Sequence, residues 1–132
     1  MLMRSKSDAS YKLGISLISN NDFFRNTQSI HCLYYSVFQM MSYKLANLKE
    51  GSCSYDRQQS ESLNSSSHEW MLLKIRENFK SAKDKIAFSE KFRKLKSERI
   101  EADYRTKLFT GIEATECRDM ADYLLAKLRQ IF

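Results

Sequence analysis

The sequence predicts an all-α fold, an antiparallel up-and-down bundle of four to five helices that forms a single domain over residues 1–132. Proline is absent and glycine occurs only three times, whereas a β-rich chain of this length needs more turn residues. Hydrophobic residues make up 42% of the chain, which is enough for one compact core. In several segments the apolar residues recur at intervals of three and four, the period of a helix with one buried face.

The first two predicted helices are separated by a polar turn at 20–22. The first is expected to start at a cap formed by Ser7 or Asp8 and to end near residue 19. The second is longer, covering about 22–49, and has the clearest apolar stripe. This stripe comprises Ile30, Leu33, Tyr34, Val37, Met41, Leu45 and Leu48.

Gly51 is expected to end the long helix, because glycine readily adopts the left-handed conformation that closes many helices. Residues 51–66 are polar and rich in serine, and we expect a flexible loop there. Ser66 and Glu69 have the spacing of a capping box, which predicts a short helix over about 67–79.

Capping patterns also predict the last two helices. The sequence SAKD at 81–84 precedes a helix of about 84–106, and Thr110 with Glu113 forms a further capping box before the final helix. The apolar stripe of the final helix comprises Cys117, Met120, Ala121, Leu124, Leu125, Leu128 and Ile131.

The net charge of +6 is concentrated in residues 74–107, where twelve basic residues stand against six acidic ones. Such a segment attracts a phosphate backbone or an acidic protein. The alternative is a solvated helix face with internal salt bridges, and charge alone does not separate the two.

The remaining sequence features bear on location and chemistry. Cys32, Cys53 and Cys117 have no metal-ligand spacing, and reduced thiols in a cytoplasmic protein are the simplest interpretation. The chain has no membrane-span pattern and no secretory signal at its start. No motif for a metal, a phosphate-binding glycine loop or another cofactor is present, so we expect none.

Arg99 occupies a position that should be buried. Phe88, Phe92 and Leu95 form the apolar stripe of their helix, and the same steps lead on to Arg99 and Ala102. A buried guanidinium is costly unless it is paired. It therefore needs a structural or a functional explanation.

Asp103 lies one turn after Arg99 and is placed to pair with it. A structural Arg99–Asp103 pair that fixes the helix register is one interpretation. The other is an anion site, because a planar group with five donors suits phosphate. Tyr104 follows directly and joins the candidate ligand-binding residues.

Four more side chains are candidates for a site. Tyr34 and Tyr35 must point about 100° apart on a helix, so one is expected in the core while the other faces a groove or partner. His31 lies next to the long stripe, and His68 lies in the first turn of the short helix. Each histidine is a candidate for catalysis, although packing or surface roles are more common for such residues.

Five segments resemble, in order, the HEPN domain family. SIHCLYYSVFQMMSYKLA at 29–46 resembles the second helix of these domains, and NDFF at 21–24 lies where they have a short turn. SHEWMLLKI at 67–75 resembles their segment after a variable loop. RIEADY at 99–104 resembles the Arg-x-x-Ala-Asp-Tyr segment of one branch, and LLAKLRQIF at 124–132 fits the closing helix.

The resemblance implies a helical bundle that is usually dimeric. The family includes the helical substrate-binding subunits of minimal nucleotidyltransferases and ribonucleases of toxin–antitoxin and defence systems. Those ribonucleases carry an arginine followed, after about four to six residues, by a histidine. Arg99 matches the arginine, but no histidine follows it in this chain.

We therefore predict a catalytically degenerate HEPN-like module that binds a nucleotide, RNA or a nucleotidyltransferase partner. The alternative is a metal-independent ribonuclease in which His31 or His68 supplies the missing base. A purely structural interaction protein is the third possibility. Candidate ligand-binding residues are Tyr34, Tyr35, His68, Arg99, Asp103 and Tyr104; Arg99, His68 and His31 are the catalytic candidates.

Overall fold

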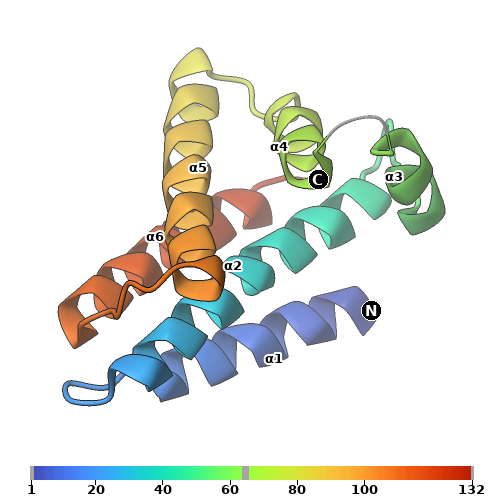
Figure 1. Ribbon diagram of the computed structural model, residues 1–132. Helices are drawn as coiled ribbons and strands as arrows, with labels where there is room; N and C mark the ends of the chain where they lie inside the picture. Colours follow the sequence, from blue (N-terminus) through green and yellow to red (C-terminus); the bar gives the residue numbers. More distant parts are fainter. Residues whose placement is uncertain (1, 64–65, 132) are drawn as a thin grey trace.

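The computed structural model describes residues 2–63 and 66–131, and that part of the chain contains six helices and no strand (Figure 1). The prediction of an all-α bundle is confirmed, with one helix more than expected. The helices are α1 (Leu2–Leu17), α2 (Phe23–Ala46), α3 (Tyr55–Glu61), α4 (Ser67–Arg76), α5 (Ala82–Tyr104) and α6 (Gly111–Arg129).

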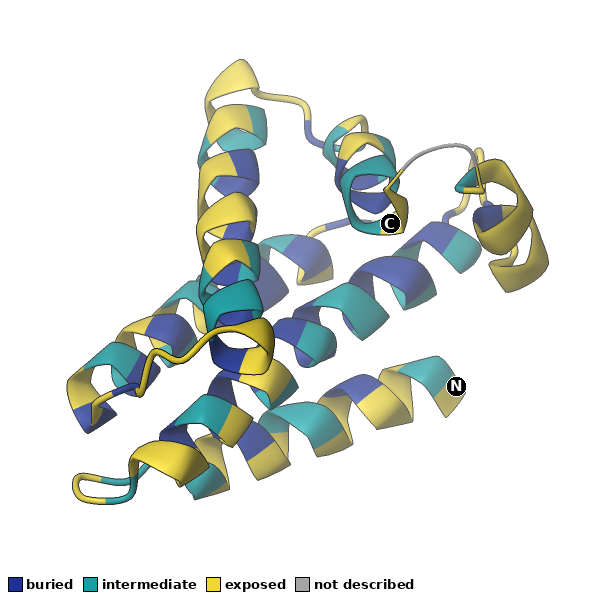
Figure 2. Ribbon diagram, in the orientation of Figure 1, coloured by how far each residue is buried: buried dark blue, intermediate teal, exposed yellow. Residues whose placement is uncertain are grey.

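The central helix of the bundle is α2, which contacts every other helix. In Figure 1, α1 lies alongside α2 and runs in the opposite direction, while α5 rises steeply across α2 and α6. The buried residues of each helix face this common interior (Figure 2). The largest fully buried side chains are Tyr34, Phe88, Phe92, Phe109, Ile30, Leu33, Met41, Leu72, Ile75, Leu95, Leu124 and Leu128.

The first helix begins at Leu2, so the predicted cap at Ser7 or Asp8 is wrong. Ser7 is buried within α1, and its hydroxyl donates to the carbonyl oxygen of Ser36 on α2 at 2.7 Å. The hydroxyl of Ser36 in turn donates to the carbonyl oxygen of Ser7. A serine that indicates a helix start in the sequence instead joins two helices, because its small side chain allows close packing.

The second helix ends at Ala46, before the predicted end near residue 49. Gly51 does adopt the left-handed conformation, with φ of 71°, but it lies in the link that follows rather than at the helix end. The expected loop over 51–66 contains α3, so the prediction of a structureless loop is wrong. Residues 64 and 65 of that segment lie outside the described residues.

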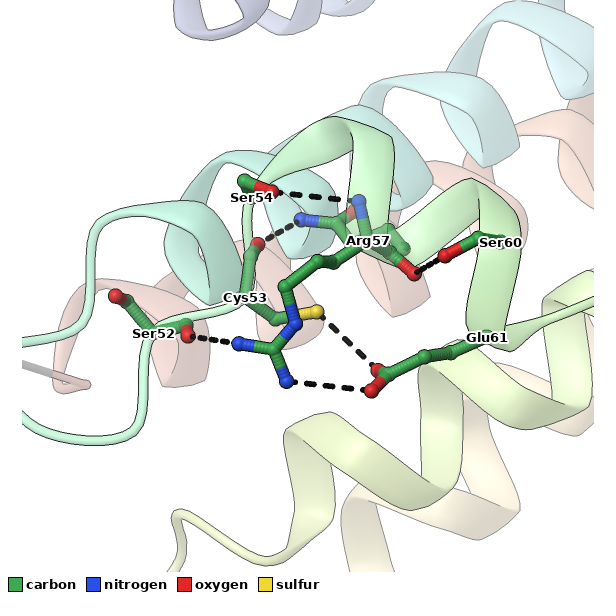
Figure 3. A network of polar contacts seen from close by, with 7 residues as sticks. Ser52, Cys53, Ser54, Arg57, Ser60 and Glu61 are labelled. Carbon is green, nitrogen blue, oxygen red and sulfur yellow. Dashed lines mark hydrogen bonds and ion pairs between the residues drawn. The ribbon is translucent and has the colours of Figure 1, made fainter.

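Polar contacts explain why this serine-rich segment forms a helix (Figure 3). Ser54 caps α3 by accepting a hydrogen bond from the backbone N–H of Arg57. The Arg57 guanidinium reaches back to the carbonyl oxygen of Ser52 and forward to Glu61. Buried Gln58 donates to the carbonyl oxygens of Cys53 and Ser42, which fastens α3 to α2. Of these bonds, the one from Gln58 to Ser42 joins two helices, so the local sequence pattern did not reveal it.

Of the three caps predicted after residue 65, two are present. Ser81 accepts a hydrogen bond from the backbone N–H of Asp84, and Thr110 with Glu113 forms a complete capping box. Ser66 precedes α4 but makes no side-chain capping bond. Its expected partner, Glu69, pairs instead with Arg93, because the packing of α4 against α5 brings this guanidinium within reach of the carboxylate.

Cys53 and Cys117 are buried and Cys32 is half-buried, and all three thiols are free. The described helices include none that is both long and apolar enough to cross a membrane.

Candidate anion-binding site

Three helices bring all the candidate residues into one cluster, which we call the Arg99 cluster. Helix α2 contributes His31, Tyr34 and Tyr35, α4 contributes His68, and α5 contributes Arg99, Asp103 and Tyr104. These positions are distant in sequence. They meet because α5 crosses α2 where α4 also packs.

Arg99 lies on the buried stripe of α5, as its spacing predicts, and is only 5% exposed. Its guanidinium carbon is 4.8 Å from the ring centre of Tyr34, 5.6 Å from that of Tyr35 and 5.8 Å from that of Tyr104. The faces of aromatic rings attract cations, by about 0.5–2 kcal/mol each depending on desolvation. The three tyrosines therefore compensate for part of the cost of burying this charge.

The predicted pair between Arg99 and Asp103 is present but loose. The Nη1 atom of Arg99 is 3.7 Å from Oδ2 of Asp103, which is beyond hydrogen-bond distance. Both Asp103 oxygens lie closer, at 2.9 Å, to Nδ1 of His31. The buried Nε of Arg99 has no hydrogen-bond acceptor among the described residues. A buried donor without a partner is destabilising, so Arg99 keeps a hydrogen-bonding group that the described residues do not use.

His31 forms the open side of the cluster. Its side chain is 47% exposed, so it is not the packing residue that its place beside the stripe suggests. A carboxylate only accepts hydrogen bonds, so Nδ1 carries the proton donated to Asp103, and Nε2 is left as the outward-facing nitrogen. His31 and Asp103 also line a shallow pocket of about 300 Å³ with Thr27, Gln28 and Ala102.

His68 lies deeper, where Nδ1 is hydrogen-bonded to the hydroxyl of Tyr34. Burial raises the pKa of Tyr34, so its hydroxyl stays protonated at neutral pH, and the tautomer of His68 sets the direction of the hydrogen bond between them. Burial, followed by the charges of Arg99 and Lys96, lowers the pKa of His68 to about 4. His68 is therefore neutral at pH 7 and adds no charge beside Arg99.

The two tyrosines divide as expected. Tyr34 is fully buried and Tyr35 is half-buried, so one lies in the core and the other beside the surface. Tyr104, in contrast, is 71% exposed and offers one face of its ring to solvent.

Phe38 belongs to the cluster but was missed in the sequence. Its ring centre is 4.5 Å from that of His68 and 6.4 Å from that of Tyr34. The signal was its position four residues after Tyr34, on the same face of α2. Phe38 therefore contacts both Tyr34 of α2 and His68 of α4.

The basic segment around this cluster is partly neutralised. Arg93 pairs with Glu69, and Lys107 contacts both Glu98 and Glu113. The interpretation of a salt-bridged helix face thus holds for these residues. Lys96 and Lys94 form no ion pair among the described residues, and they lie three and five residues before Arg99 on α5.

Comparison with protein-family models, curated proteins and solved structures found no match to this chain. Within residues 2–63 and 66–131, no group of three or more His, Cys, Asp or Glu side chains is placed to hold a metal ion.

Proposed function

We propose that this chain is a HEPN-like module that binds RNA or a nucleotide through the Arg99 cluster. The observation that carries the proposal is the buried Nε of Arg99, which has no acceptor among the described residues. Nε itself has almost no solvent-accessible area, so the side chains over it must shift before a phosphate oxygen reaches it; the phosphate then supplies that acceptor and a second charge for the guanidinium, which Asp103 contacts only at 3.7 Å.

The aromatic residues support a nucleotide rather than a simple anion. The exposed ring of Tyr104 lies beside the guanidinium, so a base stacked on it places its phosphate next to Arg99. Stacking of a base on an aromatic side chain is worth about 1–3 kcal/mol and tolerates any sequence. Lys96, about 60° around α5 from Arg99, adds positive charge beside the cluster, which suits a single strand.

Binding is best tested with a fluorescent single-stranded oligoribonucleotide at two salt concentrations. We expect Arg99→Lys to keep the fold and to weaken binding about tenfold or more, because lysine cannot make the bidentate contact. Arg118→Lys is the matched control, since Arg118 is a half-buried arginine of α6 whose ion pair among the described residues is with the neighbouring Asp119. Equal affinities for the wild type and Arg99→Lys contradict the proposal.

We expect no significant cleavage of RNA. No histidine follows Arg99, and His68 has too low a pKa, about 4, to be an effective base near pH 7. General-base help is worth roughly 10²–10⁴ in rate, so its loss leaves little turnover.

A ribonuclease is the second candidate, and the His31–Asp103 pair favours it. A carboxylate that holds one imidazole nitrogen leaves the other free to take a proton, while Arg99 lies within reach of the same carboxylate. The test is incubation of RNA with the wild type, His31→Gln, His68→Gln and Arg99→Lys, in the presence of chelator. Cleavage that disappears with both His31→Gln and Arg99→Lys establishes this second candidate.

The partners in this proposal are a second copy of the chain and a nucleotidyltransferase. Both come from the family resemblance. The exposed apolar side chains discussed below add support to the dimer.

A further inference from the structure

A second group of cations lies on another side of α2, away from the Arg99 cluster. Arg4 of α1, Lys44 of α2 and Arg129 of α6 line one pocket of about 340 Å³. Residues of a helix are rotated by about 100° each, so Lys44 points about 180° away from Tyr35 of the Arg99 cluster. The two sites thus use opposite faces of the same helix.

The positive charge of this pocket is poorly neutralised. Among the described residues, neither Arg4 nor Arg129 forms an ion pair. Asp8 is the acidic side chain that lines the pocket, and it makes no ion pair with the three cations. The ammonium of Lys44 donates to the carbonyl oxygen of Ile131 at 3.2 Å, which positions it without cancelling its charge.

Lys44 is half-buried between the two arginines. Burial, together with the charges of Arg4 and Arg129, lowers the pKa of Lys44. Keeping all three groups charged therefore costs free energy in the isolated chain, and a bound anion relieves that cost.

The walls of the pocket indicate the kind of anion. Met40 and Tyr43 contribute apolar surface beside the cations. A smaller hollow of about 120 Å³, which shares Asp8, Met40 and Arg129, continues along the groove between α1 and α6. Pockets of roughly 300 Å³ or more hold small organic ligands, so the space exceeds what a lone inorganic ion needs.

We infer that the pocket formed by Arg4, Lys44 and Arg129 binds a small organic phosphate, with its phosphate group held by the three cations. Guanidinium groups match phosphate oxygens in a bidentate geometry, and two of them from different helices surround one group. The organic part lies against Met40 and Tyr43. This inference is independent of the RNA-binding proposal, because no residue is shared between the two sites.

Inorganic pyrophosphate is a suitable probe, followed by the NMR amide shifts of Tyr43 and Lys44 at about 150 mM salt. We expect saturable shifts at these two residues in the wild type. Lys44→Gln and Arg129→Gln should each weaken binding about tenfold or more, the loss typical of a hydrogen bond to a charged group. Arg118→Gln, at a half-buried arginine of the same helix, should leave it within about twofold.

Circular dichroism must show that the variants remain folded, which we expect because Arg129 is exposed and Lys44 is only half-buried. Absence of shifts at Tyr43 and Lys44 at millimolar pyrophosphate overturns the inference. Shifts that persist unchanged in Arg129→Gln also overturn it.

A separate experiment measures binding of the chain to anionic lipid vesicles. Binding to vesicles without binding to free pyrophosphate assigns the surface to a membrane and contradicts a soluble ligand.

Discussion

At the scale of single residues, Arg99 is explained by what surrounds it. Three tyrosine rings and one loosely placed carboxylate compensate for the burial of its charge, while its Nε atom is left without an acceptor. A residue present only to fix the helix register is expected to have a tight ion pair. The arrangement seen instead retains unused hydrogen-bonding capacity at a buried arginine.

The two members of the Arg99–Asp103 pair should contribute unequally to stability. We expect Arg99→Ala to lower the free energy of unfolding by about 2–4 kcal/mol, because it removes a large side chain packed among the tyrosines. Asp103→Asn should cost about 1 kcal/mol, because the amide oxygen still accepts a hydrogen bond. Urea unfolding measures both. Equal losses, without any change in RNA binding, would indicate a purely structural pair.

His68 should make stability depend on pH. Its pKa is about 4 in the folded chain and about 6.5 when unfolded, so the unfolded state binds the proton more readily. The free energy of unfolding should therefore fall as the pH decreases from about 6.5 toward 4, and show no such contribution above that range. Thermal unfolding of the wild type between pH 7 and 5 should show this loss, and His68→Gln should reduce it. A wild-type melting temperature that stays constant over this range is the contrary result.

At the scale of elements, the α1–α2 pair depends on small residues. Ser7 and Ser36 exchange hydrogen bonds across it, and the hydroxyl of Ser29 donates to the carbonyl oxygen of Gly14 at 2.6 Å. Gly14 is buried directly against Leu33. Close approach of the two backbones, rather than a wide apolar stripe, thus holds α1 to the bundle.

Gly14→Ala should be destabilising even though alanine favours helices. A Cβ atom at this position would lie 3.0 Å from Cγ of Leu33 and 3.3 Å from its backbone nitrogen. The resulting displacement of α1 should cost about 1–3 kcal/mol, which outweighs a gain in helix propensity of about 1 kcal/mol. Ser16→Ala, an exposed change on the same helix, is the control and should be neutral or slightly stabilising in urea unfolding. A stabilised Gly14→Ala variant would refute the close-packing explanation.

At the scale of the whole molecule, one end of the bundle is held together by Asn26. This fully buried amide donates to the carbonyl oxygens of Ser19 and Phe109, which joins the α1–α2 turn to the α5–α6 link. Phe24 and Ile112 lie near this junction at the starts of α2 and α6, and they are 73% and 75% exposed. Large apolar side chains exposed at one end of a small domain are typical of a contact surface.

We predict that the chain is a dimer in which this end is covered. Sedimentation at tens of micromolar should give twice the 15.6 kDa chain mass. Phe24→Ser combined with Ile112→Ser should shift the population to the monomer, because each substitution removes apolar surface from the contact. Leu73→Ser and Ile86→Ser, at exposed apolar positions on α4 and α5, form the control pair. A wild type that sediments as a monomer contradicts the prediction.

The sequence by itself determined the helical class, the burial of the stripes and the inward position of Arg99. All three follow from periodicity, which is local. It also identified the candidate site residues one by one, from the chemistry of each residue type. Two helix starts, at Ser81 and Thr110, were equally local and were predicted correctly.

Only the tertiary structure decided which groups meet. Ser7 forms a hydrogen bond to α2 instead of capping α1, and Glu69 pairs with Arg93 of α5 instead of completing a capping box. Gln58 binds Ser42 of α2 and so anchors α3, a helix in a segment where a loop was expected. His31 reaches Asp103 across seventy-two positions of sequence. Hydrogen bonds and ion pairs act over a few ångströms, so their partners depend on how the helices cross, and a sequence pattern within one helix does not record that crossing.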